Sequence, residues 1–224
     1  MSAASADLRH VDTWLFDLDH TLYPPTFETL RRIEQRIRDY MTRLTGLPPE
    51  EAWALQRTYF DRYGGAVAGL IEHHDVDVAA FMEEIHDVPL DEVTPDPQLK
   101  AALARLPGRR LVFTNASAAH AERLLAKLDI APLFHDVFHT EAAGYVMKPD
   151  VRAFEALIAA HAVKPDTTAF FEDRADNLQT AHGLGMATVL VRPDAFDNRD
   201  SFVDHRTDDL AGFLQSARRM ETAA

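Results

Sequence analysis

The stretch Val11-Asp12-Thr13-Trp14-Leu15-Phe16-Asp17-Leu18-Asp19-His20-Thr21 decides the fold of this chain. Its first half is mostly apolar and predicts a buried β-strand over residues 11–16. Two carboxylates, Asp17 and Asp19, follow directly, with Thr21 two residues further on. In an open parallel sheet, ligands bind in the crevice outside the carboxyl ends of the strands. Paired aspartates at such a strand end are suited to bind a hard divalent cation and to supply a nucleophile with an acid–base group.

A plainer interpretation of these residues is a polar turn after a strand, in which Asp19 caps the segment that follows.

The composition limits the possible folds and functions only broadly. The chain has 224 residues, of which 46% are hydrophobic, so it is long enough for one large domain or for a core with a smaller insert. It has no cysteine, which excludes disulfides, thiolate metal sites and cysteine nucleophiles.

The net charge of −13 argues against nucleic-acid polymers and anionic membranes as partners. It leaves a small phosphorylated metabolite open as a partner, because a metal ion and local cations reverse the field inside a pocket. No apolar run reaches the ~18–20 residues of a membrane span, and residues 1–10 lack the apolar centre of a secretory signal. We therefore expect a cytoplasmic protein, monomeric or homodimeric.

The pattern along the chain predicts two parts. Residues 24–93, here called the helical insert, show helical periodicity and no strand, with helices expected over 26–44, 49–63, 67–74 and 78–86. From residue 94, helices alternate with strands expected at 109–114, 136–140, 167–171 and 186–191, before a last helix capped by Thr207. This predicts an α/β core of residues 1–23 and 94–224 with a doubly wound, Rossmann-like parallel sheet.

Polar residues follow the other predicted strands at the same edge of the sheet. Thr114-Asn115 ends the second strand, Lys148 lies in a later loop, and Glu172-Asp173 with Asp176-Asn177 follows the strand at 167–171. Alone, these segments are typical of a turn, a solvated loop and an acidic first helical turn. Because parallel strands end at the same edge of a sheet, these residues are expected to converge with Asp17 and Asp19 in one polar site.

In this order the four segments resemble the haloacid dehalogenase-like (HAD) hydrolase superfamily, whose phosphatase branch has the pattern Asp-x-Asp-x-Thr. The opening Asp-Leu-Asp-His-Thr-Leu-Tyr-Pro of residues 17–24 is most similar to the pyrimidine 5′-nucleotidase group. The segments 63–70 and 86–90 are also similar to the cap of that group. The resemblance implies that the helical insert is a small all-helical cap, placed after the first strand and closing over the site.

The resemblance also implies catalytic roles. Asp17 would attack phosphorus and form an aspartyl-phosphate. Asp19 would protonate the leaving group and then activate water, with a pKa raised by its like-charged neighbours. Thr114 and the backbone N–H of Asn115 would bind phosphoryl oxygens, and Lys148 would neutralise charge.

Further roles concern the metal and the substrate. Mg²⁺ would be ligated by Asp17, Asp173 and the backbone carbonyl of Asp19. Residues expected to support the metal ligands are Glu172, Asp176 and Asn177. Thr21 would fix the loop after the first strand, and His20 would orient it; no histidine is predicted to bind metal. The residues expected to bind substrate are Thr21, Tyr23, Tyr63 and Asn115.

Specificity is expected to come from the helical insert, hinged at residues 23–25 and 91–97. Candidates for contact with a nucleobase are Tyr23, Tyr59, Tyr63 and Arg57. The alternative is that these aromatic residues form the insert's own small core. Arg174 departs from the subgroup, which often has a small hydroxyl residue there; it would either face solvent or contact substrate.

The first hypothesis is a Mg²⁺-dependent phosphomonoesterase acting on pyrimidine nucleoside 5′-monophosphates. The alternatives are a phosphatase of sugar or other small organic phosphates, a phosphomutase, and a non-catalytic phospho-receiver or binding module. A dehalogenase is disfavoured, because Asp19 and Thr21 fit phosphate chemistry.

Overall fold

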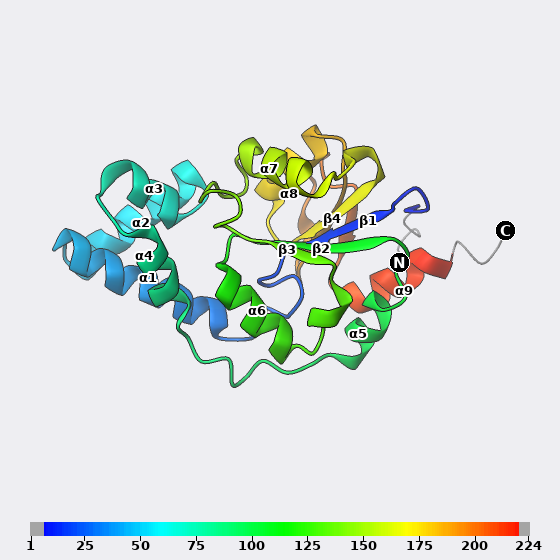
Figure 1. Ribbon diagram of the computed structural model, residues 1–224, viewed down its shortest axis with the longest axis horizontal. Helices are drawn as coiled ribbons and strands as arrows, with labels where there is room; N and C mark the ends of the chain where they lie inside the picture. Colours follow the sequence, from blue (N-terminus) through cyan, green and yellow to red (C-terminus); the bar gives the residue numbers. More distant parts are fainter. Residues whose placement is uncertain (1–6, 220–224) are drawn as a thin grey trace.

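Six parallel strands form the central sheet of the computed structural model, which describes residues 7–219 (Figure 1). Their order is β3-β2-β1-β4-β5-β6, as in doubly wound α/β folds. This confirms the predicted fold class. The strands are β1 (Thr13–Phe16), β2 (Arg109–Phe113), β3 (Asp136–Phe138), β4 (Thr168–Glu172), β5 (Ala187–Val191) and β6 (His205–Thr207).

Both faces of the sheet are buried. Successive side chains of a strand point to opposite faces, and Trp14 and Phe16 belong to one buried cluster while Leu15 belongs to the other. Helices cover the sheet from above and from below in Figure 1. Those above are α7 (Val151–His161) and α8 (Ala175–Gly183); those below are α5 (Pro97–Leu103), α6 (Ala118–Lys127) and α9 (Leu210–Arg219).

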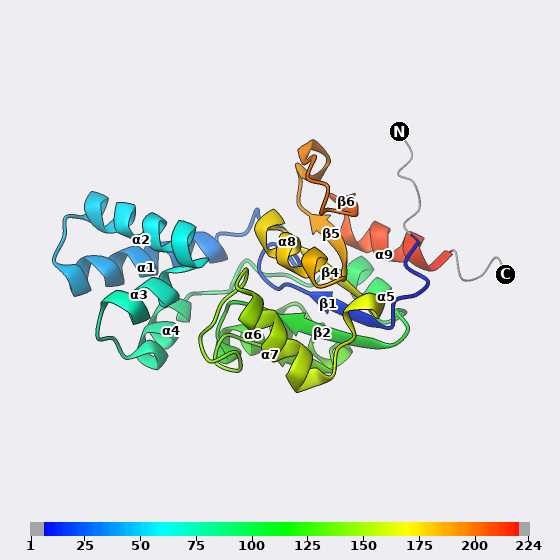
Figure 2. The same ribbon diagram turned by 90° about the horizontal axis from the view of Figure 1, so that it is seen from above.

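The helical insert lies beyond one end of the sheet (Figures 1 and 2). It holds α1 (Thr29–Thr45), α2 (Pro49–Tyr63), α3 (Ala66–His73) and α4 (Val78–His86). Helix α1 packs against α2 and α4, and α2 packs against α3. One buried cluster runs from Phe16 through Leu22 to Ile33 and Phe81, so the insert shares apolar packing with the sheet. The boundaries at residues 24 and 93 stay a prediction, and residues 1–6 and 220–224 of the predicted core lie outside the described residues.

Two local predictions were wrong. The sequence pattern missed β6, whose three residues are too few to show an alternating pattern, and Thr207 ends this strand instead of capping a helix. Helix α9 begins after Asp209, whose carboxylate accepts the N–H of Gly212 at 2.9 Å. At the other end of the chain, α1 begins three residues after Thr26, with Glu28 at its N-cap and no side-chain cap.

Three short 3₁₀ turns connect the core elements, at Ala131–Leu133, Pro165–Thr167 and Ala195–Asp197. Within residues 7–219, no helix combines the length and the apolar character that crossing a bilayer requires.

The turn before β2 gives a test of the fold. Gly108 has a φ of +70°, and a Cβ there would lie 2.1 Å from the carbonyl oxygen of Asp12, the residue before β1. Gly144 has a similar φ of +63° but open space around it. We expect Gly108→Ala to lower the free energy of unfolding by about 1–3 kcal/mol more than Gly144→Ala, because only the first adds a collision to the backbone strain. Urea unfolding of both variants measures this, and equal losses would contradict the close approach.

Candidate active site

Parallel pairing of β1 with β4 brings the predicted carboxylates together. Phe16 pairs with Phe171, so Asp17 and Glu172 leave the sheet at the same edge. Carboxylate oxygens of Asp17, Glu172 and Asp173 all lie within 4.8 Å of one another. The structure therefore juxtaposes residues that are more than 150 positions apart, and their catalytic and metal-binding roles remain predictions.

Lys148 lies at the centre of this cluster and is only 1% exposed. Its Nζ donates to Asp17 Oδ1 at 2.7 Å, to Glu172 Oε2 at 2.8 Å and to the carbonyl oxygen of Phe113 at 2.7 Å. Burial disfavours the charged amine, but Asp17 and Glu172 outweigh it and hold the pKa of Lys148 above its ordinary value. Lys148 is therefore a fixed positive charge beside the predicted nucleophile.

Asn115 holds the loop that carries this lysine. Its side chain donates to the carbonyl oxygen of Lys148 at 3.0 Å and accepts the backbone N–H of Lys148 at 2.9 Å. The neighbouring Thr114 is buried, and its Oγ1 accepts the N–H of Ala116 at 3.0 Å. The Thr114 hydroxyl proton stays available to donate toward the cavity that this residue lines.

The carboxylate cluster fits a hard cation with oxygen ligands. Burial, reinforced by the charge of Glu172 and opposed by Lys148, raises the pKa of Asp17 to about 7. Burial and the charge of Glu172 also raise the pKa of Asp173 to about 10. One lysine thus leaves excess negative charge between these carboxylates, and a divalent cation such as Mg²⁺ would balance it.

Asp19 has a different environment from the one expected. Burial raises the pKa of this carboxyl, but His120 and Tyr23 outweigh burial and hold it at about 2. The Tyr23 hydroxyl donates to Asp19 Oδ1 at 2.6 Å, and His120 Nε2 lies 3.5 Å from the same oxygen. The predicted upward shift of the Asp19 pKa is therefore wrong for this conformation, because these two partners outweigh the effect of burial.

Two histidines that the sequence analysis did not single out meet beside Asp19. His120 of α6 and His86 of α4 are both buried, with ring centroids 4.7 Å apart. His86 Nδ1 donates to the carbonyl oxygen of Met82 at 2.9 Å, whereas neither ring nitrogen of His120 has a hydrogen-bond partner among the described residues. Their contact joins the helical insert to the core. For His120, the only signal in the sequence was its position in the first turn of the helix that follows Thr114-Asn115.

A cavity of about 410 Å³ lies over these groups. Asp17, Asp19, Thr114, Lys148 and Asp173 all line it. Its other wall is the helical insert, whose contribution is mainly apolar and includes Leu30, Ile33, Ile37, Phe81, Met82 and Ile85.

The predicted aromatic contacts lie elsewhere. Tyr63 donates or accepts a hydrogen bond with His73 at 2.8 Å and lines a neighbouring cavity of about 690 Å³. Tyr59 is buried and bonds His74 at 2.9 Å, and the Arg57 guanidinium lies 4.2 Å from the centroid of Trp53. The alternative of aromatic packing within the insert describes Tyr59 and Tyr63 better, whereas Arg57 lies exposed on the surface of the insert. Substrate binding by Tyr63 remains a prediction without a place in the first cavity.

Three further predicted residues have defined positions. Tyr23 is buried and contacts Asp19 from outside the cavity wall. Thr21 is also buried, and its Oγ1 has no partner among the described residues, so no hydrogen bond shows it fixing the loop. His20 has a φ of +62°, lines the cavity, and places Nδ1 3.9 Å from Asp173 Oδ2.

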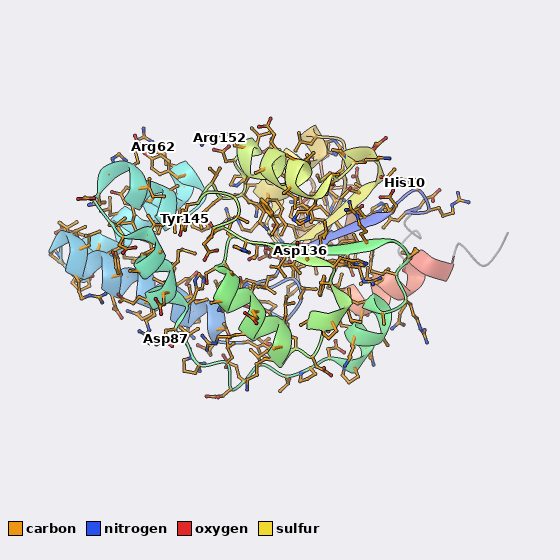
Figure 3. All side chains as sticks on the ribbon, in the orientation of Figure 1. His10, Arg62, Asp87, Asp136, Tyr145 and Arg152 are labelled. Atoms are coloured by element: carbon orange, nitrogen blue, oxygen red, sulfur yellow. The ribbon has the colours of Figure 1, made fainter. Side chains whose placement is uncertain are left out.

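Arg174 lines both cavities and does not simply face solvent. Its guanidinium lies 4.2 Å from the ring centroid of Phe60 in α2 and is paired with Asp176. Figure 3 labels three other residues around the second cavity: Arg62 from the insert, Tyr145 from the loop before α7, and Arg152 from α7. Asn177 donates to Glu172 Oε2 at 2.8 Å, as expected of a residue that supports the acidic cluster.

Comparison with known proteins agrees with this architecture. Residues 11–185 match the family model described as haloacid dehalogenase-like hydrolase. The chain belongs to this family. The resemblance found in its motifs is thereby confirmed, and the protein is a hydrolase of the haloacid dehalogenase-like type.

One curated relative is Phosphate metabolism protein 8 of Saccharomyces cerevisiae, 28% identical over 193 residues. The match covers 79% of this chain and 60% of that protein, so the chain spans about 60% of the relative's length.

Two solved structures share the fold. CbbY from Rhodobacter sphaeroides, in complex with phosphate, has a TM-score of 0.64 and 18% identity over 92% of this chain and 99% of that one. L-2-haloacid dehalogenase from Xanthobacter autotrophicus has a TM-score of 0.57 and 14% identity over 96% and 100%.

The carboxylate pKa values predict pH-dependent metal binding. Asp17 and Asp173, with pKa values of about 7 and about 10, hold protons near neutral pH that a cation must displace. We therefore expect the affinity for Mg²⁺ to rise between pH 6 and pH 8, by up to about tenfold per pH unit for each proton released. Calorimetry in buffers of different ionisation enthalpy counts these protons. The Asp173→Asn variant should bind Mg²⁺ weakly and release fewer protons on binding. An affinity for Mg²⁺ that does not change with pH would contradict the predicted metal site at Asp17 and Asp173.

The buried histidine of α4 predicts acid sensitivity. Burial, with a smaller effect of His120, lowers the pKa of His86 from 6.5 to about 4. Between these values the unfolded chain binds a proton that the folded protein does not, so the histidine's contribution to stability falls as the pH falls from 6.5 to 4. This difference corresponds to on the order of 3 kcal/mol.

His86→Gln should remove this part of the pH dependence and flatten the curve of unfolding free energy between pH 7 and pH 4.5. Urea titrations measure it, with His10→Gln as the control at an exposed histidine of the opposite end (Figure 3). If the curves of His86→Gln and the unsubstituted protein stay parallel, the burial of a neutral His86 is contradicted.

Proposed function

We propose that this protein is a Mg²⁺-dependent phosphomonoesterase that forms an aspartyl-phosphate on Asp17, with pyrimidine nucleoside 5′-monophosphates as its first candidate substrates. The observation that carries the proposal is the triple hydrogen bonding of Lys148 beside Asp17 and Glu172, at the floor of a cavity that Asp19 also lines. The nucleotide assignment is supported by the similarity of residues 17–24 to that group.

The first half-reaction uses the geometry around Asp17. Lys148 occupies Oδ1 of Asp17, which leaves Oδ2 for attack on phosphorus. The P–O bond to the leaving group breaks as the bond to Asp17 forms. Thr114 and the backbone N–H of Asn115 would bind the phosphoryl oxygens, and Lys148 would offset their charge. A bound Mg²⁺, held by Asp17, Asp173 and the carbonyl oxygen of Asp19, would supply further charge stabilisation.

Asp19 would transfer the protons. It donates a proton to the leaving oxygen, and then accepts one from the water that attacks the aspartyl-phosphate, releasing phosphate and restoring Asp17. Its contacts with Tyr23 and His120 favour the carboxylate, which suits the second half-reaction. Before the first half-reaction Asp19 needs a proton, and the negative charge of a bound phosphate raises its pKa in that direction.

The alternative functions would use the same charged residues at the bottom of the cavity. A sugar phosphatase or a phosphatase of another small organic phosphate would use identical steps. A phosphomutase would pass the phosphoryl group from Asp17 to a second hydroxyl, and a phospho-receiver would retain it. The acid–base position of Asp19 favours turnover over retention.

Substitution at the nucleophile tests the proposal. We expect Asp17→Asn to abolish phosphate release, and Asp19→Asn to lower kcat by about 10²–10⁴, the usual contribution of acid–base catalysis. The measurement is phosphate release with Mg²⁺ or EDTA from UMP, CMP, dTMP, AMP, GMP and several sugar phosphates. Asp12→Asn, an exposed aspartate just before β1, is the matched control and should keep full activity.

A preference for UMP and CMP supports the nucleotidase assignment. Sugar-phosphate-biased turnover keeps the mechanism and rejects that substrate class. Activity that survives Asp17→Asn, or no release from any substrate, contradicts the proposed mechanism.

A further inference from the structure

The cavity has two chemically different halves. Its floor holds the charged groups of the core, whereas its roof is built from apolar side chains of α1 and α4. Leu30, Ile33 and Ile37 are spaced to lie on one face of α1, and Phe81, Met82 and Ile85 come from α4, against which α1 packs. A phosphate group on the floor would therefore direct its organic part into an apolar chamber.

A single amide interrupts this chamber from α2. Gln56 lines the cavity, and its Oε1 is buried but accepts no hydrogen bond from any residue that the structure describes. Buried polar atoms are nearly always hydrogen-bonded in folded proteins, so a lone buried acceptor in a cavity wall is a candidate to accept a hydrogen bond from a ligand.

The other polar residues of the upper cavity are less suited to this task. Arg174 is already paired with Asp176 and lies against Phe60. Glu34 lines the cavity but is exposed to solvent. Gln56 is thus the residue of the insert best placed to recognise a polar atom of a buried leaving group.

We propose that the helical insert selects phosphomonoesters whose leaving group has an apolar or aromatic body with one N–H or O–H donor for Gln56. The proposal rests on the phosphatase activity proposed above. Each hydroxyl group that the apolar walls enclose without a hydrogen-bond partner weakens binding, so leaving groups rich in hydroxyls are disfavoured. In a nucleoside monophosphate the base supplies an aromatic body with an N–H donor and only the ribose carries hydroxyls, whereas a simple sugar phosphate carries hydroxyls along its whole body.

Pairs of aryl phosphates of equal shape test the proposal. The substrates are 3- and 4-aminophenyl phosphate, each matched with the methylphenyl phosphate in which a methyl group replaces the amine, together with 3,5-dihydroxyphenyl phosphate, a hydroxyl-rich ester with the same phenolic leaving oxygen. We expect the unsubstituted protein to show a kcat/KM at least about tenfold higher for the better aminophenyl phosphate than for 3,5-dihydroxyphenyl phosphate, equivalent to 1.4 kcal/mol.

Gln56→Leu should lower kcat/KM for that aminophenyl phosphate about 3- to 10-fold, the worth of one neutral hydrogen bond, and leave its methyl counterpart within about twofold. Gln35→Leu, an exposed position of α1 that does not line the cavity, is the matched control and should change neither value.

The outcomes separate the two proposals. Asp17-dependent release that is as fast from 3,5-dihydroxyphenyl phosphate, or equal changes for both members of each pair in Gln56→Leu, overturns the selection proposed here and leaves the phosphatase intact. No Asp17-dependent release from any of these substrates overturns the phosphatase function, and the selection with it.

Discussion

The site depends on one buried ammonium group. Lys148 is almost fully enclosed, and its three donors meet two carboxylates and one carbonyl oxygen. A charge in such a place is tolerated only where it is paired and fully hydrogen-bonded. The positions of Asp17 and Glu172 are therefore fixed by the same requirement that keeps the lysine charged. Removing any one of these partners would leave a buried charge unpaired and would destabilise the site.

That requirement extends into the surrounding fold. The pairing of β1 with β4 brings the two carboxylates together. The Asn115 side chain forms hydrogen bonds with both the N–H and the carbonyl oxygen of Lys148 and so fixes its backbone. The single positive charge of Lys148 cannot balance the carboxylates of Asp17, Glu172 and Asp173 together. The pKa values of Asp17 and Asp173 are accordingly raised, by burial and by the charge of Glu172. A cation bound at this edge, as proposed, would balance this charge without any additional residue.

The sequence predicted what depends on local pattern and parallel topology. The strand ending at Asp17, the order of the motifs and the meeting of Asp17, Lys148 and Asp173 follow from apolar runs and from the rule that parallel strands end at one edge. The sequence pattern failed where a pKa is set by a residue distant in the sequence, and where a strand is too short to show a periodicity. The low pKa of Asp19 depends on His120, a hundred residues away, and β6 has only three residues. The faces of the insert helices were also ambiguous, so Tyr59 and Tyr63 were equally suited to the cavity and to internal packing, where the structure places them.

The contrast between the floor and the roof of the cavity has a consequence for catalysis. Apolar walls exclude water, and excluding water would strengthen the electrostatic interactions proposed between a phosphate and Lys148, Thr114 and Asn115. The packing of the insert would therefore contribute to the proposed chemistry even though its apolar side chains carry no charge. Contacts such as His86 with His120 and Phe60 with Arg174 join the insert to the core at two separate points. One contact lies beside Asp19, and the other is made by Phe60 and Arg174, which line both cavities. A movement of the insert would therefore change the surroundings of Asp19 and the shape of both cavities together.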